Sequence, residues 1–186
     1  MKKHIITITG FPGSGKSSTA KGVAYRLGYQ HFSSGDLYRK MAEGRGLTVE
    51  ELNYAAEKQR KIDLDVDELI KRIGREKVNL VMDSRMAFHW IPESFKVFLD
   101  LDPKTAAERT FAHIQKEGRT SQTASSIDEV LKKTIERRES EQKRYQRLYS
   151  ADINDKTQFD ILIDTGVHDL EAVIKIVIAA YQRWLL

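Results

Sequence analysis

The sequence predicts an α/β domain in which a five-stranded parallel sheet is covered by helices on both faces. Five short β-like runs alternate with helical segments along the 186 residues, a pattern typical of parallel sheets. In the runs at residues 79–82 and 161–163 every residue except Asn79 is apolar, as strands buried on both faces require. A glycine-rich motif between the first strand and the first helix adds a phosphate-binding loop to this architecture.

The expected strands cover residues 5–9, 30–32, 79–83, 96–101 and 159–164. Helix starts are expected between them. Thr48 with Glu51 forms a capping box for a helix that runs to about Lys61, and Pro103 opens another helix. Ser126 caps a third helix, which runs from residue 127 to about 149. The polar stretch before it, residues 116–126, is predicted to be a loop between two helices.

The glycine-rich motif is a full match to the pattern G-x-x-x-x-G-K-[ST]. It consists of Gly10, Phe11, Pro12, Gly13, Ser14, Gly15, Lys16 and Ser17, with Ser18 opening the helix-like run at residues 18–27. Glycines let backbone N–H groups approach phosphate oxygens, and the helix N-terminus adds its positive end. In this motif Lys16 reaches the terminal phosphates and the Ser17 hydroxyl is a direct ligand of Mg²⁺. The sequence therefore predicts a site for a nucleoside triphosphate.

Composition restricts the chemistry further. The chain has no cysteine, which excludes disulfides, thiolate metal sites and a cysteine nucleophile. Its net charge of +4 suits polyphosphate ligands, but the basic residues do not form the concentrated stripe of a nucleic-acid-binding protein. No stretch is long and apolar enough to cross a bilayer, and the start does not look like a signal peptide. We therefore expect one cytoplasmic domain over residues 1–186, a monomer that binds small nucleotides and neither nucleic acid nor membrane.

Charged residues follow the second and third expected strands. Ligands of an open parallel sheet bind outside the carboxyl ends of its strands. Arg39 and Arg85 lie just after such ends, and an arginine grips phosphate with a planar fork that does not lose its charge. Asp83 ends an apolar strand and is expected to hold Mg²⁺ through water. The alternatives are a solvated helix arginine at position 39 and a turn or cap aspartate at position 83.

Four segments together resemble the nucleoside monophosphate kinases, and most of all the short archaeal-type cytidylate kinases. They are the phosphate loop, Ser34-Gly35-Asp36-Leu37-Tyr38-Arg39, Asp83-Ser84-Arg85 and the helix at residues 135–145. The likeness runs along nearly the whole chain in matching order. It implies a three-layer P-loop NTPase fold with sheet order 2-3-1-4-5, a helical acceptor-binding segment at about residues 34–75 and a short lid at about residues 116–144. The implied reaction is phosphoryl transfer from ATP, with Mg²⁺, to CMP or dCMP.

The resemblance also implies roles for individual residues. Those of the acceptor site are Ser34, Gly35, Asp36, Arg39, Arg85 and Glu141, and those of the catalytic group are Lys16, Asp83, Arg137 and Arg144. Arg137, Glu141 and Arg144 are spaced i, i+4, i+7 and share one helix face. In the lid pattern of the family, the two arginines neutralise phosphate and the acid orients one of them. The alternative is a solvated helix face with i,i+4 ion pairs.

Other arginines are assigned more weakly. Arg138 and Arg147 are assigned to the solvated face of the same helix, and Arg109 and Arg119 flank the start of the lid loop. The residues after the third strand end leave two interpretations open. Met86, Phe88, His89 and Trp90 either line the pocket of the acceptor base or form an apolar cluster under a loop.

The sequence departs from the longer bacterial cytidylate kinases at two positions, and its histidines do not form a metal-binding motif. Ser84 and Met86 stand where the longer bacterial cytidylate kinases carry a glycine and an acid. The five histidines lack the spacing of metal ligands.

Two other functions remain open at this point. A kinase for another monophosphate or for a shikimate-like hydroxyl acceptor would keep the fold and use Asp36 as its base-like residue. A nucleotide-binding regulatory or nucleic-acid-associated module would turn over weakly. A GTPase is not expected, because the guanine-binding sequence N-K-x-D is absent.

Overall fold

A computed structural model describes residues 2–117 and 124–186. Its strands are β1 (Ile5–Gly10), β2 (Gln30–Ser33), β3 (Leu80–Asp83), β4 (Phe95–Asp100) and β5 (Ile161–Asp164). All strand pairs are parallel, and the spatial order is β2-β3-β1-β4-β5. The predicted fold class and strand order are confirmed, with strand bounds shifted by one or two residues.

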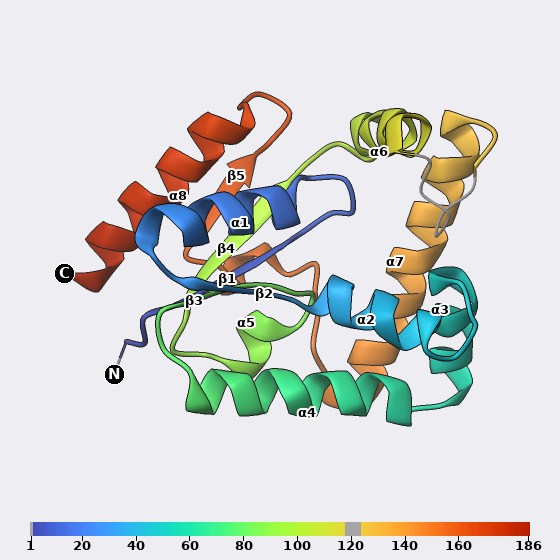
Figure 1. The fold of residues 1–186 in the computed structure, drawn as a ribbon, viewed down its shortest axis with the longest axis horizontal. Coiled ribbons are helices and arrows are strands. Elements are labelled where there is room, and N and C mark those ends of the chain that lie inside the picture. Colours follow the sequence, from blue (N-terminus) through green and yellow to red (C-terminus); the bar gives the residue numbers. More distant parts are fainter. Residues whose placement is uncertain (1, 118–123) are drawn as a thin grey trace.

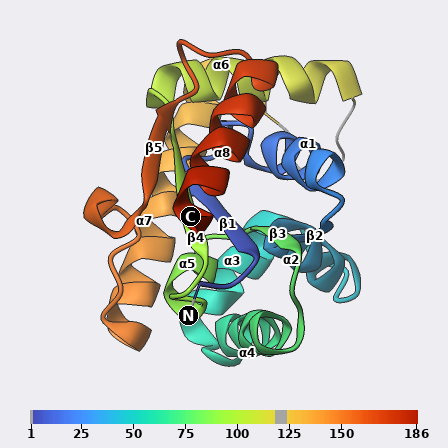
Figure 2. The same cartoon turned by 90° about the vertical axis from the view of Figure 1, so that its left-hand side faces the viewer.

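Helices cover both faces of this sheet (Figure 1). They are α1 (Lys16–Leu27), α2 (Ser34–Glu43), α3 (Val49–Lys58), α4 (Lys61–Glu76), α5 (Ala87–Trp90), α6 (Pro103–Glu117), α7 (Ile127–Tyr149) and α8 (Leu170–Leu185), with a short 3₁₀ turn, η1, at Lys156–Gln158. Helices α1 and α8 lie side by side over one face (Figure 2). Helices α4 and α5 lie against the other face, below the sheet in Figure 1.

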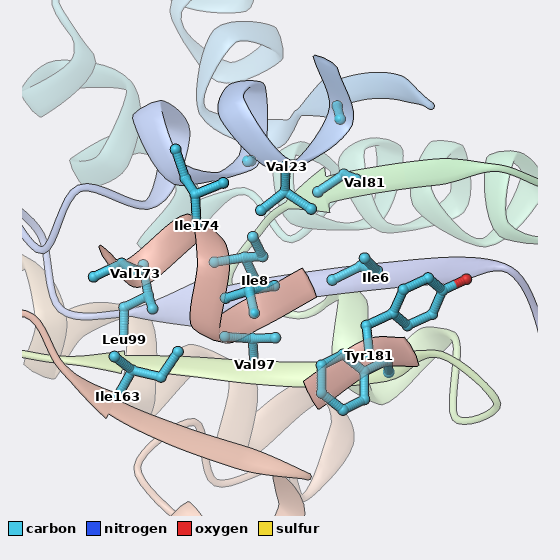
Figure 3. Close-up of a cluster of buried hydrophobic side chains, with 14 residues drawn as sticks. Ile6, Ile8, Val23, Val81, Val97, Leu99, Ile163, Val173, Ile174 and Tyr181 are labelled. Carbon is cyan, nitrogen blue, oxygen red and sulfur yellow. The ribbon is translucent and has the colours of Figure 1, made fainter. Parts of the chain in front are cut away.

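Alternate residues of β1 supply the two apolar layers. Ile6 and Ile8 are fully buried under α1 and α8, where they meet Val23 and Val177 (Figure 3 shows this cluster). Ile5 faces the opposite way and packs with residues of α4 and α5. A strand that is apolar on both faces needs this double cover, because burial of apolar surface is the main stabilising contribution.

The predicted helix caps are present. Thr48 and Glu51 form a complete capping box, and Ser126 Oγ accepts a hydrogen bond from the backbone N–H of Glu129. The helix after Thr48 ends at Lys58 rather than near Lys61, because the backbone of Gln59 leaves helical geometry before α4 begins. Helix α7 has the predicted bounds.

Helices form most of the two segments that are expected to surround the ligands, at about residues 34–75 and 116–144. Helices α2, α3 and α4 occupy the stretch between β2 and β3, which matches the expected acceptor segment. The expected lid comprises the end of α6, the first part of α7 and residues 118–123, which lie outside the described residues. In the described ranges, no helix is long and apolar enough to span a membrane.

Candidate functional site

The phosphate-binding loop connects β1 to α1, and its glycines are required by geometry. Gly10, Gly13 and Gly15 have φ angles of 147°, 83° and 82°. A Cβ on Gly10 would lie 2.1 Å from the Leu99 carbonyl oxygen, and one on Gly13 would lie 2.7 Å from the Ala106 carbonyl oxygen. Any side chain at these two positions would clash with backbone, so the loop needs glycine there.

Lys16 and Ser14 give the phosphate-binding loop polar groups that can bind an anion. Lys16 Nζ donates a hydrogen bond to the Phe11 carbonyl oxygen at 2.8 Å. Burial, followed by the nearby charge of Arg85, lowers the pKa of Lys16 well below its usual value. A polyphosphate would reverse this effect, because an anion next to a lysine favours its charged form. Ser14 Oγ is buried without a hydrogen-bond partner in the described part of the chain.

Asp83, at the end of β3, joins the phosphate-binding loop to the neighbouring strand β2. Its Oδ1 accepts hydrogen bonds from Ser17 Oγ at 3.1 Å and from Ser33 Oγ at 2.9 Å, and its Oδ2 lies 2.7 Å from His31 Nε2. The carboxylate is 4% exposed. The expected pair of Mg²⁺ residues, Ser17 and Asp83, is thus brought together. His31 was not predicted, since a single histidine in a short strand has no motif to mark it.

The donor set at Ser17 and Asp83 fits Mg²⁺. Both side chains offer oxygen, which this ion prefers, and Mg²⁺ usually keeps several waters and binds substrate phosphates with one or two protein carboxylates. Across residues 2–117 and 124–186, no three His, Cys, Asp or Glu side chains form a metal-binding group. Such a sparse set of protein ligands is what an ion held mainly by phosphate and water requires.

Glu141 links two of the predicted arginines. Its Oε2 lies 2.7 Å from Arg85 Nε, and its Oε1 lies 2.9 Å from Arg137 Nε. Arg85 also donates a hydrogen bond from Nη1 to the Gly10 carbonyl oxygen at 3.0 Å. Burial would raise the pKa of Glu141, but the charges of Arg85 and Arg137 outweigh it and lower the pKa to about 2. Glu141 therefore stays ionised and positions Arg85, which follows β3, and Arg137 of α7.

Arg144 lies on the same helix but has different partners. Its Nε lies 2.8 Å from Asp63 Oδ2, its Nη2 donates to Asn53 Oδ1 at 3.1 Å and its Nη1 donates to Ser140 Oγ at 2.7 Å. The side chains of Arg144 and Asp63 are 4% and 3% exposed. Sequence reasoning missed Asp63 and Asn53. The sequence does place Asp63 and Asp67 four residues apart, on one face of a helix, and this spacing could have marked them as a pair. The structure shows that both are buried on α4.

Two cavities meet at the phosphate loop. The larger, of about 710 Å³, lies between the loop, α3, α6 and α7, and the smaller, of about 180 Å³, lies between the loop, α2, α4, the end of β3 and α7. Lys16, Ser17 and Arg137 line both cavities. A group bound in one cavity can therefore approach a group bound in the other beside these three side chains.

The smaller cavity collects most of the expected acceptor residues. Those on its wall are Ser34, Gly35, Arg39, Arg85 and Glu141, and the expected catalytic residues Lys16, Asp83, Arg137 and Arg144 line it as well. Asp36 is not on this wall. Its carboxylate Oδ1 accepts a hydrogen bond from Arg39 Nη2 and forms an ion pair with that side chain on α2.

One assignment on α7 was wrong. Arg138, expected on a solvated face, is partly buried, with its guanidinium 5.0 Å from the centre of the Phe11 ring and Nη2 2.5 Å from Asn154 Oδ1. The segment around residue 154 folds back against α7 and shields this face from water. Arg147 is exposed, as expected.

Of the two weaker arginine candidates, one belongs to the described residues. Arg109 lines the larger cavity and donates a hydrogen bond to the Thr165 carbonyl oxygen at 2.9 Å. Arg119 falls outside the described residues.

The aromatic residues after β3 form an apolar cluster. Phe88 packs on Phe159 with ring centres 4.8 Å apart, and Trp90 packs on Tyr149 with ring centres 4.7 Å apart. The His89 ring lies 4.5 Å from that of Trp90. Of the four residues that sequence reasoning considered for the acceptor base, only Met86 lines the smaller cavity.

A family model and several curated relatives match most of this chain. A family model described as an AAA domain matches residues 9–128. A cytidylate kinase from Archaeoglobus fulgidus is 34% identical over 178 residues, which cover 95% of this chain and 94% of the relative. A cytidylate kinase from Natronomonas pharaonis is 36% identical over 182 residues, which cover 95% of this chain and 90% of the relative.

A solved structure supports the fold alone. The shikimate kinase from Bacteroides thetaiotaomicron superposes with a TM-score of 0.61 at 18% identity and covers 97% of this chain and 95% of its own. Sequence identity that low carries no statement about substrate. The archaeal relatives match at higher identity and over nearly full length, and the predicted resemblance is confirmed: this chain belongs to the cytidylate kinase family.

Proposed function

We propose that this protein transfers the terminal phosphoryl group of ATP to a nucleoside monophosphate, with CMP or dCMP as the preferred acceptor. The observation that carries the proposal is the pair of cavities that meet at Lys16, Ser17 and Arg137. A two-substrate kinase needs separate sites for donor and acceptor that share one point of transfer. The names of the archaeal relatives support cytidylate as the acceptor.

The larger cavity is the proposed donor site. The loop that borders it offers backbone N–H groups and the N-terminus of α1 to the phosphates, with Lys16 at the terminal end. Ser17 would hold Mg²⁺ directly and Asp83 would hold it through water. When bound, this ion neutralises charge on the phosphate oxygens.

The smaller cavity is the proposed acceptor site. Ser34, Gly35 and Arg39 at the start of α2 would bind the monophosphate, and Arg85 would border it from the end of β3. Arginine suits this task because its donors match the geometry of a phosphate. Glu141 keeps Arg85 and Arg137 in place, so the cations are oriented before a ligand arrives.

Transfer then depends on positioning and on charge. Phosphoryl transfer passes through a loose transition state whose charge spreads over the moving group, so nearby fixed cations lower its energy. Lys16 and Arg137 lie where the cavities meet and would supply that charge. Arg144 lines the acceptor cavity and would act as a second cation from α7, with Asp63 fixing its position. Closure of a lid over residues 116–144 would exclude water, which would otherwise accept the phosphoryl group.

The proposal also covers the domain organisation, oligomeric state, location and partners of the protein. Residues 1–186 would act as one kinase domain, monomeric and cytoplasmic, with nucleotides as its partners and no role in binding nucleic acid. Light scattering with and without nucleotide tests the monomer, and a salt-dependent RNA-binding assay tests the last point.

An acceptor screen tests the proposed function. ADP formation from ATP and Mg²⁺ is measured in a coupled assay with CMP, dCMP, UMP, AMP, GMP and shikimate. We expect CMP and dCMP to stimulate ADP release most strongly and Lys16→Ala to abolish the signal. Stimulation by shikimate alone would show a different small-molecule kinase. RNA binding without stimulation by any acceptor would show a nucleotide-binding module instead.

A further inference from the structure

The smaller cavity has two chemically different sides. Lys16, Arg39 of α2, Arg85 after β3 and Arg137 of α7 make one side basic. The other side comes from α4, the helix below the sheet in Figure 1, which contributes Val66, Asp67 and Ile70. A monophosphate carries two negative charges at most pH values of interest and belongs at the basic side. The rest of the acceptor is therefore directed toward α4.

Asp67 stands out on the α4 side because one of its two carboxylate oxygens has no hydrogen-bond partner among the described residues. It is 2% exposed, and its Oδ2 has no hydrogen-bond partner among the described residues. Asp63, one turn earlier, differs in this respect because Arg144 neutralises it. Buried polar groups nearly always have partners, so a lone buried oxygen on a cavity wall points to a ligand that supplies one.

The surroundings of Asp67 keep it available. Burial raises the pKa of its carboxyl group to about 6, and Tyr149 and Trp90 lower it by a smaller amount. The Tyr149 hydroxyl and the Trp90 indole nitrogen are themselves buried without hydrogen bonds of good geometry. Tyr38 Oη, on the wall of the same cavity, is also buried and unpartnered. Tyr149 and Trp90 thus lie close enough to Asp67 to affect its carboxyl group, but Oδ2 accepts no hydrogen bond from any of the described residues.

We propose that Asp67 determines the base specificity of the acceptor site by accepting a hydrogen bond from the exocyclic amine of the base. The inference rests on the proposed function and names a residue that carries its specificity. Cytosine presents its N4 amine as a donor, whereas uracil presents the O4 carbonyl at the corresponding place. A carboxylate oxygen opposite O4 would stay unpaired and would be repelled by it, so uracil is disfavoured.

The size of the cavity adds a second criterion. Adenine and guanine also carry exocyclic amines, so an acceptor oxygen alone does not exclude them. The cavity of about 180 Å³ is small for a ligand site, which favours a base with one ring. Met86, Val66 and Ile70 would contact the faces of that ring. Asp67 thus separates cytosine from uracil, and the apolar wall separates one ring from two.

The test combines a change in the protein with a change in the ligand. Asp67→Leu keeps the shape of the side chain and removes its oxygens, and the CMP analogue that lacks the 4-amino group removes the proposed donor. Dissociation constants of CMP, this analogue and UMP are measured by calorimetry on the wild type and the variant, beside kcat and KM. Asp65→Leu is the matched control, because Asp65 is exposed on the same helix.

We expect the wild type to bind CMP on the order of tenfold or more tightly than the analogue or UMP, a difference of about 1.4 kcal/mol. In Asp67→Leu the three ligands should bind alike, with the loss confined to CMP, and Asp65→Leu should behave as wild type. Asp67→Asn keeps one acceptor oxygen and should retain most of the preference. If Asp67→Leu does not fold, the wild-type comparison of CMP with its analogue still decides.

Two results overturn the inference. One is equal binding of CMP and the analogue by the wild type, and the other is a CMP preference that survives in folded Asp67→Leu. Both are distinct from failure of the proposed function, in which no nucleoside monophosphate stimulates ADP release by the wild type. A chain that phosphorylates CMP with an unchanged preference in Asp67→Leu would keep its proposed function and lose this residue assignment.

Discussion

Arg144 of α7 and Asp63 of α4 form an ion pair with Nε and Oδ2 2.8 Å apart, and both side chains are almost completely buried. The pair joins the helix expected to carry the lid to the segment expected to hold the acceptor. Asn53 and Ser140 complete the hydrogen bonds of the guanidinium. A buried charge is tolerated only when paired and hydrogen-bonded in this way.

Asp63→Ala should destabilise the protein strongly. It leaves the Arg144 charge buried without its anion, and loss of one partner of a buried pair costs about 3–5 kcal/mol. The free energy of unfolding from urea denaturation measures the effect. Asp65→Ala on the same helix is the control, because a change at this exposed site should stay within about 0.5 kcal/mol. Equal stability of the two variants would mean that the ion pair contributes nothing.

Arginines on the two sides of the transfer point should differ in kinetics. Arg39→Ala should mainly raise KM for the acceptor, because Arg39 would bind the ground-state monophosphate. Arg137→Ala should lower kcat on the order of a hundredfold, because that charge would act mainly in the transition state. Exposed Arg147 provides the control on α7, since Arg138 packs beside Phe11. Similar small effects at positions 39, 137 and 147 would favour a solvated helix face.

His31→Leu should weaken nucleotide binding only when Mg²⁺ is present. The imidazole lies 2.7 Å from Asp83 Oδ2 and holds the carboxylate whose other oxygen contacts Ser17. Loss of a residue that orients a metal-binding group typically costs about 10–100-fold in affinity for the metal. Calorimetry with ADP, with and without Mg²⁺, measures the effect, and His31→Gln should restore part of it. An equal loss under both conditions would contradict the role in metal binding.

Asp67→Asn should change the pH dependence of stability. Burial raises the pKa of Asp67 from 3.8 to about 6, so the folded state takes up a proton that the unfolded state does not bind between about pH 4 and pH 6. The contribution of Asp67 to stability therefore falls as pH rises through this window. Asn carries no charge, so the stability of the variant relative to wild type should increase by about 2 kcal/mol from pH 4.5 to pH 7, since one pKa unit is worth about 1.36 kcal/mol.

Urea denaturation at the two pH values measures this difference. Glu141, with its pKa of about 2, is present in both proteins, so its titration cancels in the comparison. A stability difference that is the same at pH 4.5 and pH 7 would show that Asp67 has an ordinary pKa in the folded protein.

Residues close together in the sequence were enough to predict the strands of the fold and the phosphate-binding loop of the site. The strands, the loop from Gly10 to Ser17 and the capping box at Thr48 depend on residues close together in the chain, and all were predicted from it. The strand order followed from the family resemblance. The placement of Arg85 and Asp83 followed from the rule that ligands bind at the carboxyl ends of parallel strands.

Tertiary pairing explains what sequence reasoning missed. Arg144 and Asp63 are 81 positions apart, and only the packing of α7 on α4 shows which carboxylate meets which arginine. The same holds for His31 and Asp83, which are brought together by adjacent strands. Arg138 was misassigned because its charge-rich neighbourhood on α7 resembles a solvated face, whereas Phe11 and Asn154 cover it.

The most direct test of the whole account is kcat/KM for CMP, UMP and AMP with saturating ATP and Mg²⁺. We expect kcat/KM for CMP to exceed that for both other acceptors by at least about tenfold, equivalent to about 1.4 kcal/mol of transition-state discrimination, with UMP ahead of AMP. Lys16→Ala should be inactive with all three and should unfold like wild type. AMP as the best acceptor, or turnover by Lys16→Ala close to that of wild type, would contradict it.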